Sequence, residues 1–335
     1  MAIVNIEGSD TVFECASEDS LLRAALRAGL QISYECNSGG CGCCKVRVQE
    51  GKVENLFPEA PALTERDVRK GMVLACQNKC LTGEMLIKTR LETWDPKLTR
   101  PVRFKATLEE KVEIASDLIE FVFAIDQDID YRAGQFFMLD VPGIGERAYS
   151  NSSITMGERE IKFVIKRMPA GKGSNYLFNE ATPGDVFGCD GPFGHSYFRD
   201  EVERDVVLVA GGSGLSPMLS VLRHLSSRSD LTRNVTFYYG AKALNELNEN
   251  YIREAAAGLR GKFTLSCGLS GSEEECGNWS GERGFIHEVV DRQLENYNDN
   301  EFYLCGPPPM TAAAQKHLMV DKKVPFDQVH FDRFF

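Results

Sequence analysis

The chain has 335 residues, 43% of them hydrophobic and 26% charged, which suits a protein of two or three globular domains. Its formal net charge of −11 argues against nucleic acid as a partner, because phosphate binding requires a basic face. Residues 1–10 lack the basic and apolar regions of a signal peptide, and no apolar run reaches the length of a membrane span. We therefore expect a cytoplasmic protein without membrane association, whose cysteines serve metal or redox chemistry.

Residues 20–30 predict an amphipathic helix near the N-terminus. Its apolar side chains recur on one face, and Gly29 suits its C-terminal end. A loop rich in glycine and cysteine follows this helix directly.

The cysteine loop has the spacing C-x4-C-x2-C at Cys36, Cys41 and Cys44, with Cys76 further along the chain. Two irons bridged by two sulfides need four converging thiolates, and this is the plant-type [2Fe–2S] spacing. The glycines of the loop let the backbone wrap closely and direct N–H groups at the sulfurs. The sequence thus predicts a [2Fe–2S] cluster on Cys36, Cys41, Cys44 and Cys76.

A four-cysteine zinc site is the alternative, since Cys41 and Cys44 also form C-x2-C. Structural zinc usually pairs two short C-x2-C elements, whereas here one loop supplies three cysteines. Cys43 and Cys80 are the ambiguous residues, and Cys80 is able to exchange roles with Cys76. We favour Cys76 because it ends an apolar run.

After a proline-broken linker, residues 102–201 predict short alternating strands joined by turns rich in Gly and Pro, as in a small antiparallel barrel. Examples of these strands are residues 118–125, 135–141 and 160–166. Within it, Arg147, Tyr149 and Ser150 offer a cation for a pyrophosphate, a flat aromatic ring and a hydroxyl for a flavin. The glycine-rich turn at residues 171–174 opens a helix predicted at residues 175–180, an arrangement that binds phosphate.

From residue 205 the pattern changes to fully apolar strands that alternate with helices, which predicts a parallel sheet covered on both faces. Two of these helices are expected at residues 246–257 and 309–320. The first strand, residues 206–210, leads into glycines and a helix that begins near Pro217, typical of dinucleotide binding although G-x-G-x-x-G is absent. Cys305 ends the last of these strands, at the sheet edge where ligands bind.

In this order the motifs resemble the N-terminal-ferredoxin class of ferredoxin–NADP⁺-reductase-like flavoproteins, the reductase components of bacterial multicomponent mono- and dioxygenases. The resemblance covers nearly the whole chain and implies an α+β and α/β multidomain fold. Its parts are a β-grasp [2Fe–2S] ferredoxin domain at 1–93, a linker at 94–101, a six-stranded antiparallel Greek-key FAD barrel at 102–201 and a Rossmann-like parallel α/β NAD domain at 202–335.

The resemblance also implies roles for individual residues. Ser150 and Cys305 are the expected catalytic residues, next to the flavin and the nicotinamide. The implied cofactor contacts are Arg147, Tyr149, Ser150, Ile165, Lys166, Gly173 and Ser174 for FAD, and Gly211, Gly212, Gly214, Pro217, Cys305, Gly306 and Pro307 for the dinucleotide. Phe334 or Phe335 is the expected aromatic cover of the flavin.

NADH is the expected coenzyme. NADP-using relatives hold the 2′-phosphate with a Ser-Arg pair, but Ser270 is followed here by glycine and then by Glu273, Glu274 and Glu275. Carboxylates repel a 2′-phosphate, although Lys242 and Arg283 are cations in the same region.

The predicted function is therefore an NAD(P)H:acceptor oxidoreductase that passes electrons from NADH through FAD and [2Fe–2S] to a terminal oxygenase. The acceptor is a Rieske or diiron oxygenase or an intermediate ferredoxin, and a monomer suffices. The alternatives are a reductase of a sugar-nucleotide deoxygenation system and a non-enzymatic metal-binding module.

Overall fold

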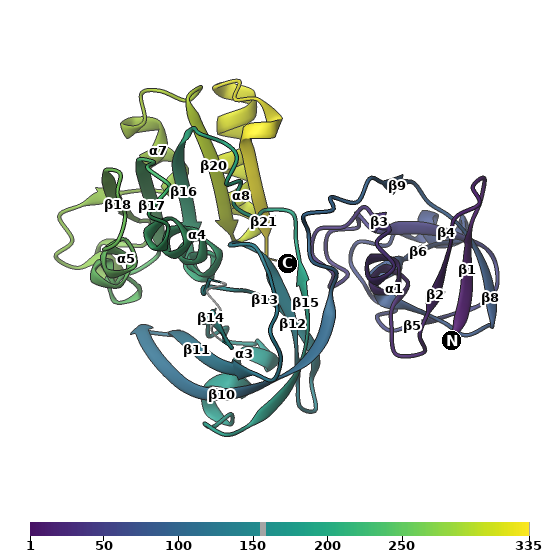
Figure 1. Cartoon of the computed structure of the whole chain (residues 1–335). Coiled ribbons are helices and arrows are strands. Elements are labelled where there is room, and N and C mark those ends of the chain that lie inside the picture. The colour runs from purple at the N-terminus through teal and green to yellow at the C-terminus, as the bar shows by residue number, and fades with distance from the viewer. Residues whose placement is uncertain (155–158, 335) are drawn as a thin grey trace. The chain divides into compact units, whose positions relative to one another are not determined.

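The computed structural model describes residues 1–154 and 159–334 (Figure 1). The chain divides into two compact units, one of residues 1–103 with 190–194 and one of residues 104–189 with 195–334. Among the described residues, no helix has the length and apolar character needed to cross a membrane.

The N-terminal unit is built on a five-stranded sheet with the order β2-β1-β8-β4-β6. Its strands are β1 (Ala2–Ile6), β2 (Val12–Cys15), β4 (Lys45–Glu50), β6 (Met72–Leu74) and β8 (Glu84–Lys88). β1 and β8 run parallel, whereas β1 pairs antiparallel with β2, and β4 pairs antiparallel with β6 and β8. The smaller elements are β3 (Gln31–Ile32), β5 (Val53–Asn55), β7 (Asn78–Cys80), β9 (Leu91–Glu92), α2 (Glu65–Arg69) and η1 (Ala75–Gln77).

The predicted helix of this unit is α1 (Leu21–Arg27). Ser20 begins it as N-cap, because its side chain accepts a hydrogen bond from the backbone N–H of Arg23. Leu21, Leu22, Ala25 and Leu26 are buried, as the apolar face predicts. The mixed sheet with its helix is the β-grasp arrangement expected from the sequence.

The predicted linker packs against α1. Leu98 and Pro101 are buried, and Arg27 donates a hydrogen bond of 2.7 Å to the carbonyl oxygen of Pro101.

The second unit begins with a six-stranded sheet in the order β13-β12-β15-β10-β11-β14. Its strands are β10 (Val102–Ala115), β11 (Leu118–Ile125), β12 (Phe136–Val141), β13 (Gly145–Ser150), β14 (Glu160–Lys166) and β15 (Val186–Phe193). Antiparallel ladders join β10 to β11, β11 to β14, and β12 to β13. Aromatic side chains, including Phe121, Phe123, Phe137 and Phe163, fill its interior, and the helix α3 (Lys172–Asn179) follows β14.

The third sheet has the order β19-β18-β17-β16-β20-β21, and all its ladders are parallel. Its strands are β16 (Asp205–Gly211), β17 (Val235–Ala241), β18 (Phe263–Leu269), β19 (Glu282–Arg283), β20 (Asn300–Gly306) and β21 (Val329–Arg333). The helices between them are α4 (Leu215–Ser227), α5 (Glu249–Ala255), α6 (Glu273–Cys276), α7 (Ile286–Gln293) and α8 (Pro308–Gln315). Short 3-10 turns lie at η2 (Gly212–Gly214), η3 (Leu244–Glu246) and η5 (Phe326–Gln328).

The last two sheets share one apolar core. Ile114, Leu118 and Val164 of the antiparallel sheet pack in the same buried cluster as Met218 and Leu222 of α4. The flavin and nucleotide segments therefore form a single compact unit.

Several helices start or end away from their predicted bounds. The helix expected at residues 175–180 begins at Lys172, and the one expected at 246–257 begins at Glu249 because the Asn248 side chain caps it. The helix expected at 309–320 is α8, which continues as the π-helical stretch Lys316–Asp321.

Candidate cofactor sites

The cysteine loop directs backbone N–H groups at its own sulfur atoms. Cys36 Sγ accepts hydrogen bonds from the N–H groups of Cys41 at 3.3 Å and Ser38 at 3.5 Å, and Cys41 Sγ accepts one from Cys43 at 3.4 Å. Gly39 and Gly42 have φ of 88° and 77°, a left-handed backbone that favours glycine. The loop thus stabilises negative charge on its sulfurs, the form in which cysteine binds iron.

The four predicted ligands meet as two pairs of thiols. A hydrogen bond from the Cys41 thiol lowers the pKa of Cys36 to about 5, and one from the Cys76 thiol lowers the pKa of Cys44. Cys76 reaches Cys44 because the N–H of Ala75 donates to the carbonyl oxygen of Cys44 at 2.9 Å. A [2Fe–2S] cluster needs two thiolates at each iron, so this donor set fits the group.

The two ambiguous cysteines have other neighbours. Cys43 is exposed and its thiol lies 3.7 Å from the carboxylate of Glu35. The Cys80 thiol hydrogen-bonds to the thiol of Cys15, which lies at the end of β2.

The flavin segment brings a cation and an aromatic ring to the start of α3. A Cβ atom added at Gly173 would lie 3.1 Å from Arg147 Cγ and 3.2 Å from the Tyr149 hydroxyl oxygen. Arg147 and Tyr149 therefore lie on one face of β13, in agreement with the alternation of side chains along a strand. Burial raises the pKa of Tyr149 to about 12, so its hydroxyl stays protonated and available as a donor.

The start of α3 is suited to a phosphate. Its N-cap, Gly171, has no side chain that could cap the helix, so the first N–H groups are left available at the helix end. Ser174 Oγ accepts a hydrogen bond from the N–H of Met168 and donates one to the carbonyl oxygen of Gly171, both 3.1 Å long. These bonds fix the turn that presents the N–H groups.

Two residues predicted to line the flavin lie differently from Arg147 and Tyr149. Ile165 packs inside the barrel core, so its backbone is the part available to a cofactor. Lys166 makes an ion pair of 2.9 Å with Glu246, and its Cδ lies 3.6 Å from a Cβ built at Gly212. Lys166 thus extends toward the nucleotide segment.

The dinucleotide segment assembles at the carboxyl edge of the parallel sheet. A Cβ atom at Gly214 would lie 2.0 Å from the Cys305 carbonyl oxygen, and one at Gly211 would lie 2.4 Å from Met310 Sδ. Only glycine allows this approach of η2 to the end of β20. Pro217 is buried in the first turn of α4, and Pro307 is the N-cap residue of α8.

Cys305 is fully buried, and burial raises its thiol pKa well above the usual value. The thiol is therefore neutral. It contributes shape and packing, rather than charge, to the sheet edge at the end of β20. The N–H of Phe334 donates a hydrogen bond of 3.2 Å to the carbonyl oxygen of Gly306. The other predicted flavin cover, Phe335, lies outside the described residues.

The predicted coenzyme-selective region is an ion-paired cluster. Lys242 pairs with Glu275, and Glu275 also accepts a hydrogen bond of 2.8 Å from the N–H of Ser272 as part of a capping box. Arg283 is exposed in β19, opposite Leu269 at the end of β18.

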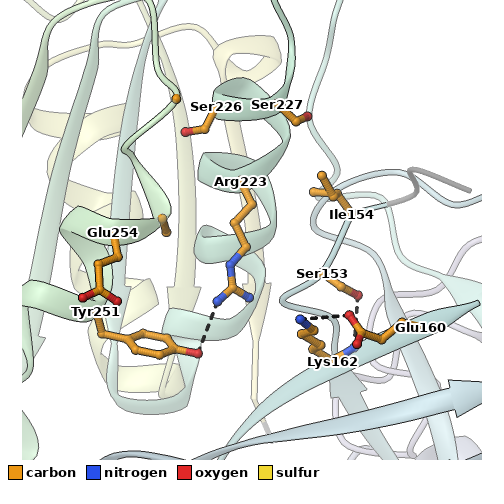
Figure 2. A pocket seen from close by; sticks show the side chains of 11 residues that line it. Ser153, Ile154, Glu160, Lys162, Arg223, Ser226, Ser227, Tyr251 and Glu254 are labelled. Carbon is orange, nitrogen blue, oxygen red and sulfur yellow. Dashed lines mark hydrogen bonds and ion pairs between the residues drawn. The ribbon is translucent and has the colours of Figure 1, made fainter. Parts of the chain in front are cut away.

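A cleft of about 450 Å³ lies elsewhere, where α4 and α5 face the antiparallel sheet (Figure 2). Its lining includes Lys162, Arg223, Ser226, Tyr251 and Glu254. None of the residues predicted to bind a cofactor lines it. Sequence patterns missed these side chains, because single polar residues far apart in the chain carry no recognisable spacing.

Family models match three segments of the chain, which correspond to its three main sheets rather than to its two compact units. Residues 4–81 match the 2Fe-2S iron-sulfur cluster binding domain, residues 105–198 the oxidoreductase FAD-binding domain, and residues 208–316 the oxidoreductase NAD-binding domain.

Similar proteins extend over nearly the full chain. The ferredoxin–NAD⁺ reductase component of an alkene monooxygenase system from Xanthobacter autotrophicus is 35% identical over 96% of this chain and 97% of its own length. A ferredoxin–NAD(P)⁺ reductase from Metapseudomonas resinovorans is 35% identical over 96% of both chains.

Solved structures agree with these relatives. The ferredoxin reductase in carbazole 1,9a-dioxygenase matches with a TM-score of 0.90 and 31% identity, covering 100% of this chain and 98% of that chain. The chain belongs to the ferredoxin–NADP⁺-reductase-like flavoproteins with an N-terminal [2Fe–2S] domain, the family of the reductase components of oxygenase systems.

Proposed function

We propose that this chain draws electrons from NADH and delivers them through FAD and a [2Fe–2S] cluster to the oxygenase component of a multicomponent system. The observation that carries the proposal is that one chain contains residues suited to each of three sites, for the cluster, for FAD and for the dinucleotide. These are two thiol pairs in the N-terminal unit, a cation and aromatic pair at the start of α3, and the glycine-lined edge at Cys305.

When bound, FAD and the cluster supply hydride acceptance and one-electron transfer, so the protein's part is binding and orientation. Arg147 and the first N–H groups of α3 are placed to bind a pyrophosphate. Gly214 lets η2 pack closely against Cys305 at the sheet edge where the nicotinamide is proposed to bind. The neutral Cys305 thiol orients the nicotinamide without placing a charge beside it.

The partner is inferred from relatives. Similar proteins are named as reductase components of alkene, phenol and propane monooxygenases and as the electron transfer component of a 2-halobenzoate 1,2-dioxygenase. We infer an oxygenase component, or a ferredoxin that serves one, as the acceptor. Because one chain holds all three sites, a monomer is sufficient.

NADH is the proposed coenzyme because Lys242, one of the two cations in the predicted coenzyme-selective region, is already engaged in an ion pair. Glu275 neutralises Lys242, and Glu273 and Glu274 add negative charge in the same short helix. A 2′-phosphate entering this region would meet net negative charge.

The proposal is tested on protein purified with its cofactors under anaerobic conditions. We expect flavin and iron–sulfur absorption in the visible spectrum, bleaching of the flavin by NADH, and a low-temperature EPR signal after reduction. Colourless protein that contains stoichiometric zinc would contradict the proposal.

A further inference from the structure

We propose that a polar stripe on α4, formed by Ser216, Ser220 and Arg223 and anchored on Glu120, positions the dinucleotide loop against the flavin-contacting segment for hydride transfer. This inference rests on the proposed function. It assigns positioning roles to residues that have no predicted contact with any cofactor.

The three stripe residues recur at helical spacing, so they share the face of α4 that meets the antiparallel sheet. Ser216 Oγ donates a hydrogen bond of 2.6 Å to the carbonyl oxygen of Ser150, the predicted flavin residue. The same oxygen accepts one of 2.9 Å from the N–H of Val164 on β14. Ser216 thus joins the first turn of α4 to two strands of the flavin barrel.

The second stripe residue binds the segment that follows Ser150. Ser220 Oγ lies 2.6 Å from both Asn151 Oδ1 and the carbonyl oxygen of Ser153, and it accepts a hydrogen bond of 3.3 Å from Gly134. All three partners belong to the flavin segment. The stripe therefore holds the backbone from Ser150 to Ser153 along one helix face.

Arg223, which is half-buried, completes the stripe with an ion pair to the buried Glu120. Its guanidinium donates to Glu120 Oε1 at 2.6 Å, to Glu120 Oε2 at 3.3 Å and to the carbonyl oxygen of Ser152 at 2.9 Å. Glu120 is 3% exposed and also accepts hydrogen bonds of 2.5 Å from the hydroxyls of Ser152 and Tyr251. Figure 2 shows Arg223 and Tyr251 extending toward one another at the cleft.

This network specifies one arrangement of the two sheets. A buried ion pair adds little net stability compared with apolar residues, but it is costly when one partner is missing or displaced. Burial alone would raise the pKa of Glu120, yet the ion pair with Arg223 and the hydrogen bonds lower it, so the carboxylate stays charged. Sliding α4 along the barrel would leave that charge unpaired.

The stripe is well placed to control hydride transfer because α4 starts at Leu215, directly after η2. η2 packs on Cys305 at the predicted nicotinamide site, while Ser216 holds Ser150 at the predicted flavin site. Arg223 lies eight residues along the helix from Leu215, about 12 Å at 1.5 Å per residue. Loss of the Arg223 contacts lets α4 tilt, and this tilt displaces η2 at the N-terminal end of the helix.

The test is Arg223→Met in the holoprotein, compared with wild type by rapid mixing with NADH and with NADH deuterated at C4. We expect flavin reduction at saturating NADH to slow about 10-fold or more, because small displacements of reacting groups cost large factors in rate. The primary isotope effect should rise, whereas the Kd for NADH should change less than about threefold. The control is Arg253→Met on α5, which removes an exposed pair with Glu249 outside the stripe and should match wild type.

A variant that keeps the fold separates positioning from stability. In Glu120→Leu/Arg223→Met both charges are replaced by apolar side chains, which a buried site usually tolerates. We expect this double variant to retain FAD and the wild-type melting temperature while remaining slow in flavin reduction. Wild-type rates in either Arg223→Met or the folded double variant would overturn the inference. Failure of NADH to reduce the flavin of the wild type would instead overturn the proposed function.

Discussion

At the scale of single residues, the choice between Cys76 and Cys80 decides the ligand set. Cys76 is 2% exposed and hydrogen-bonds to Cys44, whereas Cys80 hydrogen-bonds to Cys15. Replacing Cys76 by Ser should therefore abolish the cluster, seen as loss of iron and of the EPR signal, while NADH still reduces the flavin. The flavin chemistry survives because no residue of the N-terminal unit is predicted to contact NADH.

Cys80→Ser is the matched control for that prediction. It removes one thiol four residues from Cys76 and should leave iron content and the EPR signal at wild-type values. Loss of the cluster in Cys80→Ser with retention in Cys76→Ser would reverse the assignment.

Coenzyme selection is also a matter of single side chains. Glu275→Gln removes the partner of Lys242 and frees a cation near the predicted 2′-position. Exposed ion pairs contribute about 0.2–1 kcal/mol, so kcat/KM for NADPH should rise only a few-fold while that for NADH stays unchanged. Lys242→Gln removes the cation instead of its partner and should not raise kcat/KM for NADPH. If Glu275→Gln left the ratio of kcat/KM for NADH to kcat/KM for NADPH unaltered, the ion pair would have no part in coenzyme selection.

Whether the role of a residue is predictable from sequence depends on how far along the chain its interaction partners lie. Cys36, Cys41 and Cys44 were recognisable because a tight loop fixes their spacing within nine residues. Glu120 and Arg223 are 103 residues apart, and each alone resembles an ordinary charged surface residue. Their pairing depends on how two sheets pack, which no local pattern encodes.

At the scale of elements, the position of η2 depends on one close contact, between Gly214 and the backbone of Cys305 at the end of β20. Any side chain at Gly214 would overlap the backbone of Cys305, since a Cβ there falls 2.0 Å from its carbonyl oxygen. Gly214→Ala should therefore displace η2 from β20, destabilise the second unit by about 1–3 kcal/mol and weaken NADH binding. Thermal unfolding and NADH titration measure the two effects.

The control for that substitution is Gly143→Ala, at a glycine with open space around its Cβ. Its φ of 70° makes alanine strained in the backbone without a steric clash, so it should destabilise the protein but leave NADH affinity unchanged. Equal NADH affinity in both variants would show that η2 tolerates displacement.

Strands were easier to predict than helix ends. The strands at Leu118–Ile125 and Glu160–Lys166 have their predicted bounds, because alternation and β-branched content persist to the last residue. Helix starts depend on capping contacts such as that of Asn248, which competes with the preceding η3 turn. The π-helical continuation of α8 likewise has no signature in apolar spacing.

At the scale of the whole molecule, the pattern of apolar residues distinguishes the flavin segment from the nucleotide segment, yet the two segments share one apolar core. Ile114, Leu118 and Val164 read as ordinary strand residues of a barrel. Only the packed structure shows that this face is covered by α4. The change from alternating to fully apolar strands near residue 205 therefore marks a change of sheet type rather than the end of a compact unit.

Two compact units with separate cores should unfold separately, so calorimetry of the holoprotein should resolve two transitions rather than three. Leu222 is fully buried in the core that joins the flavin and nucleotide sheets. Leu222→Ala should lower the stability of that unit by about 2–5 kcal/mol and shift flavin release together with unfolding of the parallel sheet. The transition of the N-terminal unit, followed by cluster absorbance, should not move. Flavin release at an unchanged temperature, with only the parallel sheet destabilised, would mean that the two sheets unfold independently despite their common core.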